Sequence, residues 1–586
     1  MSKTFQKFDE QDLQYYQLLA QQFPTIKDVC REIINLESIL NLPKGTEHFM
    51  SDIHGEFDAF KHILNNCSGV IKEKIKTYFY QDLTKGEMEE LSTLIYYPCE
   101  KMKQLKTLHL LDKQWLRIQI HYLILLIKKL SLKYTRSKVR KAIPEAYVYI
   151  IEELINERDH DSHTQKQYQN HIIETMISID MAEEFIIVLT DLIKRLAVDQ
   201  LHIIGDIYDR GERPDKIIDL LMQYHNIDIQ WGNHDILWMG ACCGNLACIT
   251  RVIKNCLSYH NEKILENRYA ISLRLLERYA QKRFPYLKRR EAMLQTISIM
   301  LLKCEGTLIL KHPEYQMDHQ LKLHQVHNHE IIINHNVYKI NNIENDDCCY
   351  ELNDEENELL LKLQSAFKHS EKLNAHVKFL YKKGSMYEQQ ARKAYYKRDL
   401  EAIDFMFYLW SGYHSPLSGR ELKTFERIYI HDEKVWVEKR NPYYQFYHQE
   451  EICCQILKEF QMDPKKCHII NGHTPVKLNE KPLKANGKVI VIDGGFCKRY
   501  QKETGIAGYT LISNSHGILL KSHTPFKGID RVLQINSDIH SSSENIEVYQ
   551  HRMLVKDSDI GEKIIEQMTQ LKILLDAYQT GIIIPK

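Results

Sequence analysis

The chain has 586 residues, and its 78 basic and 78 acidic side chains give a formal net charge of zero, which offers no reason to expect nucleic acid or an acidic membrane as a partner. The N-terminal stretch contains no apolar run typical of a secretory signal, and no segment reaches the roughly 18 to 20 apolar residues that span a bilayer. We therefore expect a soluble, cytoplasmic protein without a nucleic-acid or membrane partner. The 14 cysteines form no C-x-x-C pair and are predicted to be reduced thiols.

Because the sequence contains no repeat and no clear linker, we expect one catalytic body spanning residues 1–586.

Helical periodicity dominates the first part of the chain. Residues 1–45 carry apolar residues at intervals of three and four until a Pro-Lys-Gly break. Residues 70–195 continue this period and are predicted to form a helical insertion. Its charges are interspersed in both signs, which favours a solvated surface over a basic binding surface.

Later segments alternate between helical and extended patterns. Residues 241–410 are predicted to be mostly helical, with hairpins indicated by the alternation at Thr307–Leu310 and Glu330–Ile333. Residues 425–525 are predicted to be β-rich, and residues 555–586 to form a terminal helix and tail.

The most informative stretch is Gly205-Asp-Ile-Tyr-Asp-Arg-Gly211, which follows a short apolar run that predicts a buried strand. Two carboxylates, Asp206 and Asp209, and the guanidinium of Arg210 are therefore placed at the end of a strand, where α/β folds concentrate their functional groups. Hard-cation ligands beside a fixed phosphate-binding donor predict chemistry on a phosphate ester.

Three further motifs each follow a predicted strand. Residues two apart in an extended segment share a face, so Asp52 and His54 can converge on one ion. His234 carries the side chain that exchanges a proton near neutral pH without help. Each motif alone is more typical of a turn, but an ordered set at strand ends predicts one site. The motifs are Asp52-x-His54, Gly232-Asn233-His234-Asp235 and Gly472-His473.

This ordered set resembles the calcineurin-like metallophosphoesterase superfamily, and the Asp-Arg-Gly variant resembles its phosphoprotein-phosphatase branch. A closer similarity, over nearly the whole chain, is to the class III fructose-1,6-bisphosphatase family of bacteria. The resemblance implies an α/β fold, namely a β-sandwich flanked by helices with long helical insertions, that holds two metal ions in strand-end loops. The similar stretches are Ser51–Phe57, Gly205–Gly211, Gly232–Ala241, Lys368–Tyr387, Ser415–Arg427 and Val491–Thr510.

The resemblance also implies a ligand for each metal position. Asp52 and His54 would bind the first metal, and Asp206 would bridge both ions. Asn233 and His473 would bind the second metal. Mixed oxygen and nitrogen ligands favour Mn²⁺ or Fe over Mg²⁺ alone.

The implied chemistry is hydrolysis of fructose 1,6-bisphosphate to fructose 6-phosphate and phosphate, as gluconeogenesis requires. Arg210 would clamp the scissile phosphate. His234, oriented by Asp209, would protonate the leaving alkoxide. The candidates to bind the second phosphate are Arg420, Lys423 and Arg427. A structural or solvated role is equally open for these three side chains.

One departure from the family pattern concerns the second metal. The family carries a His-Gly segment after a Ser-Met-Tyr triplet, whereas Tyr387 here runs directly into the helical pattern of residues 388–396. The chain is therefore an active sugar bisphosphatase, another phosphomonoester or phosphoprotein phosphatase, or a catalytically impaired relative with a binding role. The helical insertions are predicted to provide the contacts of a homo-oligomer.

Overall fold

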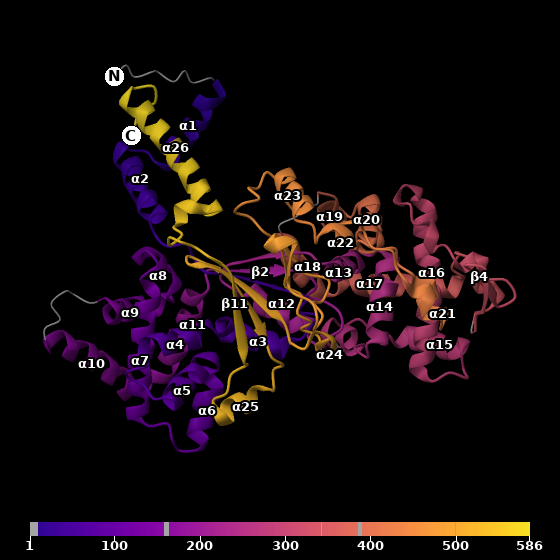
Figure 1. Cartoon of the computed structure of the whole chain (residues 1–586), viewed down its shortest axis with the longest axis horizontal. Coiled ribbons are helices and arrows are strands. Elements are labelled where there is room, and N and C mark those ends of the chain that lie inside the picture. Colours follow the sequence, from indigo (N-terminus) through magenta and orange to yellow (C-terminus); the bar gives the residue numbers. More distant parts are fainter. Residues whose placement is uncertain (1–9, 157–162, 342, 385–388, 499) are drawn as a thin grey trace.

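The structure is a computed structural model that describes residues 10–156, 163–341, 343–384, 389–498 and 500–586. Among these residues, a mixed six-stranded sheet lies at the centre of a helix-rich α/β fold (Figure 1), in the order β11-β10-β9-β1-β2-β3. β1, β2 and β3 run parallel, whereas β9, β10 and β11 continue the sheet antiparallel. The strands are β1 (Glu47–Ser51), β2 (Gln200–Ile204), β3 (Ile227–Gln230), β9 (Tyr509–Asn514), β10 (Gly517–His523) and β11 (Ser541–Val548).

A smaller sheet of β6 (Ile469–Asn471), β8 (Val489–Val491) and β7 (Leu483–Lys484) packs against the large one. Ile490 and Ile492 from the β8 region share an apolar cluster with Leu511 of β9 and Leu520 of β10. The alternation of strand side chains places these residues on the inner faces of both sheets. The strands predicted before the four motifs are confirmed, whereas β11 was not predicted from the sequence.

The helices between β1 and β2 form a helical module with a hydrophobic core of its own, seen at the lower left of Figure 1. Ile71, Leu123 and Phe185 are fully buried in this core. Burial of an apolar stripe on each helix accounts for the three- and four-residue period of the sequence. The module comprises α4 (Val70–Phe79), α5 (Lys85–Tyr96), α6 (Pro98–Thr107), α7 (Lys113–Ser131), α8 (Arg136–Ala142), α9 (Val148–Ile155), α10 (His163–Ser178) and α11 (Ala182–Ala197).

A second group of helices packs beside β3 and contributes to the largest hydrophobic core. Every residue of α13 (Asn233–Cys243) is buried, so the helix that follows β3 is fixed on all sides. α16 (Arg289–Lys311) is long and apolar enough to cross a membrane, but 78% of its most apolar window is buried, as in a core helix of a soluble protein. The other helices are α3 (Phe57–Asn65), α12 (Pro214–Met222), α14 (Leu246–Ser258), α15 (Arg274–Arg283), α17 (Asp354–His369), α18 (Glu371–Lys383), α19 (Gln389–Arg392) and α20 (Leu400–Ser411).

The extended segment predicted at Thr307–Leu310 is wrong, because these residues form the last turns of α16. A short apolar run does not distinguish a buried helix from a strand, and α16 is buried on several faces. The hairpin predicted at Glu330–Ile333 is confirmed as β4 (Glu330–Ile333) paired with β5 (Asn336–Lys339). Among the described residues between 425 and 525, three α-helices precede the strands and a short fourth one, α24 (Gln501–Thr504), lies between β8 and β9. The other helices of this region and of the segment after it are α21 (Thr424–Tyr429), α22 (Tyr443–Phe446), α23 (Glu450–Glu459) and α25 (Ile529–Ile535).

The two ends of the chain meet in a third helical unit at the upper left of Figure 1. There α1 (Glu10–Gln22) and α2 (Ile26–Leu40) pack on α26 (Asp559–Gln579). Val29, Leu571 and Leu574 are fully buried between them. This packing explains the apolar periodicity predicted at both termini.

Candidate active site

The four motifs lie together at one edge of the large sheet. The parallel registers place Ser51 of β1 opposite Ile204 of β2, and Ile204 opposite Gln230 of β3. The loops that leave these strands therefore run side by side, and the backbone amide of Asp52 donates to the carbonyl of Gly205 at 3.1 Å. Functional side chains of parallel sheets gather at such carboxyl ends.

Several residues of these loops adopt a left-handed backbone that is uncommon for residues other than glycine. The φ angles are +52° at Asp52, +47° at His54 and +55° at Asp206. Asp209, Arg210 and His473 share this conformation. Strained backbone of this kind clusters at functional sites, where the surrounding structure holds it in place.

Two glycines permit the closest approaches between the loops. A Cβ atom on Gly232 would lie 2.1 Å from Asp206 Oδ1, and one on Gly472 would lie 2.6 Å from Asp52 Oδ2. Both positions therefore require glycine, because a side chain would displace a carboxylate. The amide of His473 donates to Asp52 Oδ2 at 2.9 Å, which joins the fourth motif to the first.

Asp52, His54 and Asp206 present ligand atoms that lie within 4.8 Å of one another, and all three side chains are buried. His54 Nδ1 donates to the carbonyl of Tyr208 at 3.1 Å, so its Nε2 lone pair is directed toward the carboxylates. Asn233 Oδ1 is buried without a hydrogen-bond partner among the described residues. His473 Nδ1 lies 3.8 Å from Asp206 Oδ2. This set of oxygen and nitrogen donors, with one orphaned acceptor, fits a transition-metal cation.

Electrostatics in the cluster favour a bound cation. Burial and the nearby carboxylates of Asp493 and Asp206 raise the pKa of Asp52 well above its usual range. Burial opposes ionisation of Asp206 as well, but the imidazoles of His234, His473 and His54 hold its pKa below the usual range. A divalent cation neutralises such crowded carboxylates.

Asp493 is a member of the cluster that the sequence reasoning did not assign. Burial raises its pKa to about 7, although the amide of Gly495 donates to Oδ1 at 3.0 Å. Its carboxyl interacts directly with that of Asp52. The signal that could have identified it is an Asp-Gly-Gly turn directly after the apolar strand at residues 489–492.

His234 and Asp209 form a buried pair, with His234 Nδ1 donating to Asp209 Oδ2 at 2.7 Å. Asp209 is held by further donors, Trp238 Nε1 at 3.2 Å and Asn255 Nδ2 at 2.8 Å. Burial raises the pKa of Asp209, but the hydrogen bonds from His234, Asn255 and Trp238 together outweigh it and leave the pKa below the usual range. The ionised carboxylate therefore fixes the tautomer of His234 and leaves Nε2 for chemistry.

Arg210 lies at the wall of a cavity of about 130 Å³ that is also lined by His54, Asp206 and His473 of the cluster. Its guanidinium carbon is 4.7 Å from the ring centre of Tyr500, a distance typical of a cation–π contact. Its Nε is buried without a partner among the described residues, so a donor remains for a ligand. A second cavity of about 360 Å³ shares Asp206 and His473 with the first and leaves room for a larger ligand.

The three candidates for a second anion site lie in different places. Arg420 lines the 130 Å³ cavity, whereas Lys423 and Arg427 line neither cavity of the site. Arg427 Nε pairs with Glu438 at 3.1 Å, and Nη1 of Arg420 lies 3.5 Å from the same carboxylate. Arg440, which the sequence reasoning did not identify, also lines the smaller cavity and forms a β-bridge with Arg420.

The chain is similar to proteins of one family over nearly its whole length. A family model described as Firmicute fructose-1,6-bisphosphatase matches residues 14–392 and 388–580. A fructose-1,6-bisphosphatase class 3 of Clostridium botulinum (strain Langeland / NCTC 10281 / Type F) is 43% identical over 645 residues, covering 98% of this chain and 96% of that relative. A protein of the same name from Clostridium novyi (strain NT) is 42% identical, with 98% and 97% covered. No solved structure matches the chain.

The two matched segments meet at residues 388–392. This is the place where the resemblance implied a His-Gly segment that the sequence lacks. Residues 385–388, which include Tyr387, lie outside the described part of the chain, and α19 begins at Gln389 and continues into the π-helical turn Lys393–Lys397. The helix predicted for residues 388–396 is therefore confirmed from Gln389 onward.

Proposed function

The chain belongs to the Firmicute fructose-1,6-bisphosphatase family, and on this premise we propose that it hydrolyses fructose 1,6-bisphosphate to fructose 6-phosphate and phosphate. The observation that carries the proposal is the convergence of Asp52, His54 and Asp206 on one buried point beside Arg210. A metal-dependent phosphoric monoester hydrolase uses this combination of cation ligands and phosphate donor. The reaction supplies fructose 6-phosphate for gluconeogenesis.

The metal positions follow from the donor set. Asp52 and His54 would hold one cation, Asp206 would be shared, and Asn233 and His473 would hold the second. We propose Mn²⁺ as the metal, with Fe or Mg²⁺ as alternatives, because nitrogen and oxygen ligands are mixed. Bound cations supply the positive charge that stabilises the attacking and leaving oxygens of the displacement.

The remaining steps belong to side chains of the chain itself. Arg210 presents parallel N–H donors that match a phosphate, so it orients the scissile group. His234 carries its transferable proton on Nε2, because Nδ1 is bonded to Asp209. The histidine therefore donates this proton to the alkoxide of the leaving sugar. Packed aromatic rings around His234, including that of Trp410 at 5.2 Å between centres, limit access of bulk water.

The second phosphate of the substrate is assigned to Arg420 and Arg440. Both guanidinium side chains line the same cavity as Arg210, from the segments on either side of their β-bridge. This placement supports Arg420 over Lys423 and Arg427, which line neither cavity of the site. Two phosphate sites in one cavity distinguish a bisphosphate from a monoester.

The packed sheets and the site at their strand ends support a calcineurin-like metallophosphoesterase sandwich as the fold. We further propose one catalytic body over residues 1–586, a cytoplasmic location, and a sugar bisphosphate as partner rather than nucleic acid or membrane. The helical module of residues 70–195 is the proposed contact surface of a homo-oligomer. A second candidate function, a catalytically impaired relative, is favoured by the absence of the family's His-Gly segment after Tyr387.

A comparison of substrates tests the proposal. Phosphate release from fructose 1,6-bisphosphate is measured with Mn²⁺ beside release from fructose 1-phosphate, p-nitrophenyl phosphate and a phosphoserine peptide. We expect the highest kcat/KM for the bisphosphate, and its loss in Asn233→Ala. A higher kcat/KM for the peptide would assign the protein to the phosphoprotein phosphatases, and no turnover of any ester by folded protein would support the impaired relative.

A further inference from the structure

A basic segment crosses the boundary between α7 and α8. Residues 128–141 contain seven lysines and arginines and no acidic residue. The expectation of interspersed charge in the helical module therefore fails at this place. Because the whole chain is neutral, the excess is local. A local excess of positive charge is stabilised either by solvation or by a bound anion.

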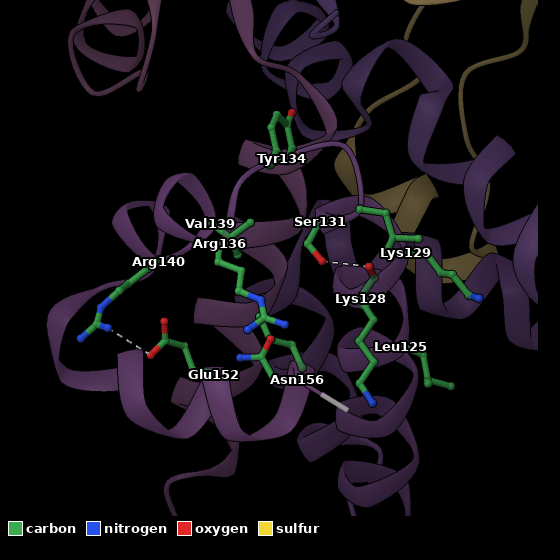
Figure 2. Close-up of a pocket in the computed structure, with 12 residues that line it drawn as sticks. Leu125, Lys128, Lys129, Ser131, Tyr134, Arg136, Val139, Arg140, Glu152 and Asn156 are labelled. Atoms are coloured by element: carbon green, nitrogen blue, oxygen red, sulfur yellow. Dashed lines mark hydrogen bonds and ion pairs between the residues drawn. The ribbon is translucent and has the colours of Figure 1, made fainter. Parts of the chain in front are cut away.

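The short helix α8 divides these charges between two cavities. Arg136 and Arg140 line the cavity drawn in Figure 2, where Arg140 Nη1 lies 3.7 Å from Glu152. Lys138 and Lys141 line a second cavity of about 500 Å³. We call this second space the junction cavity, because its walls come from the helical module, the sheet and the terminal helices.

The junction cavity carries an excess of positive charge. Its basic lining residues are Lys44, Lys133, Lys138, Lys141 and Arg195, against two acidic residues, Glu47 and Asp199. Asp199 is already engaged, since Oδ1 pairs with Lys138 and Oδ2 accepts from the hydroxyl of Tyr134 at 2.6 Å and from the amide of Thr46 at 2.9 Å.

Two cations of the cavity lack an acidic partner among the described residues, Lys141 and Arg195. Arg195 donates to the carbonyl of Ala142 at 3.3 Å, which fixes its guanidinium near the end of α8. Lys133 is nearly enclosed, and burial lowers its pKa to about 8. Lysine and arginine donors without a counter-charge are the usual partners of phosphate groups.

The cavity also has an apolar wall and a size that suits a small molecule. Ile39, Leu42, Leu196 and Ile560 also line it. Its volume falls in the range of roughly 300 to 1,000 Å³ that is common for ligand sites. An amphiphilic occupant with a charged end therefore matches this mixed apolar and basic lining.

We propose that the junction cavity binds a phosphorylated small molecule, with its phosphate at Lys141 and Arg195, beside the Lys138–Asp199 pair. A dianionic phosphate matches the uncompensated charge better than a single carboxylate does. The site is separate from the active site, because Glu47 and Gln200 in its wall begin β1 and β2, whereas Asp52 and Asp206 follow their far ends. A five-residue strand spans roughly 17 Å.

Hydrogen exchange with imidodiphosphate as the probe tests the site in the full chain. The probe is a nonhydrolysable anion with two phosphorus centres, so the test needs no turnover and is independent of the proposed function. We expect slower exchange in α8 and in the segments around residues 44–47 and 195–200. In a Lys141→Gln and Arg195→Gln double variant, the probe concentration that gives half of the maximal protection should rise at least tenfold.

Arg136→Gln is the matched control, since it removes a charge from the same helix on the face of the other cavity (Figure 2). We expect this variant to bind the probe within twofold of the unmodified protein. Equal weakening by Arg136→Gln would show a diffuse charge effect and overturn the proposal. Slower exchange confined to residues 52–57, 205–211 and 232–235 would place the probe in the active site and overturn it as well.

Discussion

Asp209 accepts a hydrogen bond of 2.7 Å from Nδ1 of His234, and both side chains are buried at the ends of neighbouring strands. The pair fixes the imidazole so that Nε2 faces the cavity. Asn255 and Trp238 hold Asp209 from the other side. The proton donor is thus oriented before a substrate arrives.

Replacement of Asp209 should therefore impair turnover more than binding. In Asp209→Asn the carboxylate that stabilises the protonated imidazole of His234 is replaced by a neutral amide, so the proton donor is lost. We expect kcat to fall about 10²- to 10⁴-fold, the usual range for a lost proton transfer, with KM within threefold. Steady-state kinetics measure both. Trp238→Phe removes one hydrogen bond to Asp209 and should lower kcat far less. An equal fall in kcat in both variants would contradict the role of Asp209 in orienting His234.

The glycine contacts predict a metal-affinity defect. A Cβ at position 232 would lie 2.1 Å from Asp206 Oδ1, so Gly232→Ala must displace this carboxylate. We expect the affinity for Mn²⁺ to fall about 10- to 100-fold, as when groups that support a metal ligand are lost. Calorimetric titration measures it. Gly86→Ala is the control, because no atom lies within 4 Å of a Cβ there; a similar defect in both variants would contradict the contact.

Arg440 predicts a difference between substrates. Removal of a charged donor to phosphate costs about 1.5 to 3 kcal/mol, which corresponds to roughly a 10- to 100-fold change. We expect Arg440→Gln to raise KM for fructose 1,6-bisphosphate by this factor and to leave KM for fructose 1-phosphate within twofold. Lys423→Gln should change neither value. An equal effect of Arg440→Gln on both substrates would remove Arg440 from the second phosphate site.

Two buried histidines away from the active site predict acid sensitivity. Burial lowers the pKa of His48 and of His523 to about 3. The unfolded chain binds these protons near pH 6.5 and the folded chain does not, so stability falls as the pH drops from about 6.5 toward 3. Each histidine contributes a slope of up to about 1.4 kcal/mol per pH unit in this window.

His523→Gln should reduce the slope. The side chain can retain polar contacts to Thr510 and Ser541, which now bond the imidazole at 2.9 and 2.8 Å. Urea unfolding between pH 4 and 7 measures the free energy of unfolding at each pH. The exposed His327, changed to Gln, is the control. An unchanged slope in His523→Gln would contradict the buried neutral state of His523.

The sequence predicted the active-site loops because each motif follows a short apolar strand. Glycines at the turns and polar residues directly after a strand are local signals, and β1, β2 and β3 lie where these signals placed them. The loops meet at one edge of the sheet because β1, β2 and β3 pair in parallel. The sequence indicated this meeting only through the resemblance of the ordered motifs to a known family.

Residues that join the site through tertiary packing gave no such signal. Arg440 and Asn255 lie in helical or irregular segments, and only the folded chain brings them to the cavity or to Asp209. Asp493 had a local signal in its Asp-Gly-Gly turn, but only the folded chain shows that its carboxyl contacts Asp52 and belongs to the cluster. The misassigned strand at Thr307–Leu310 reflects burial on several faces of α16, which removes the helical period.

We propose a metal-dependent bisphosphatase whose metal ligands include Asn233 and His473, although the sequence lacks the His-Gly segment that the resemblance implies. The most direct test of this claim is phosphate release from fructose 1,6-bisphosphate by chelator-treated protein during a titration with Mn²⁺, with bound metal counted in the same samples. We predict that activity returns and saturates at two ions per chain, and that Asn233→Ala stops at one ion without activity. Folded protein that releases no phosphate at any Mn²⁺ concentration would contradict the claim.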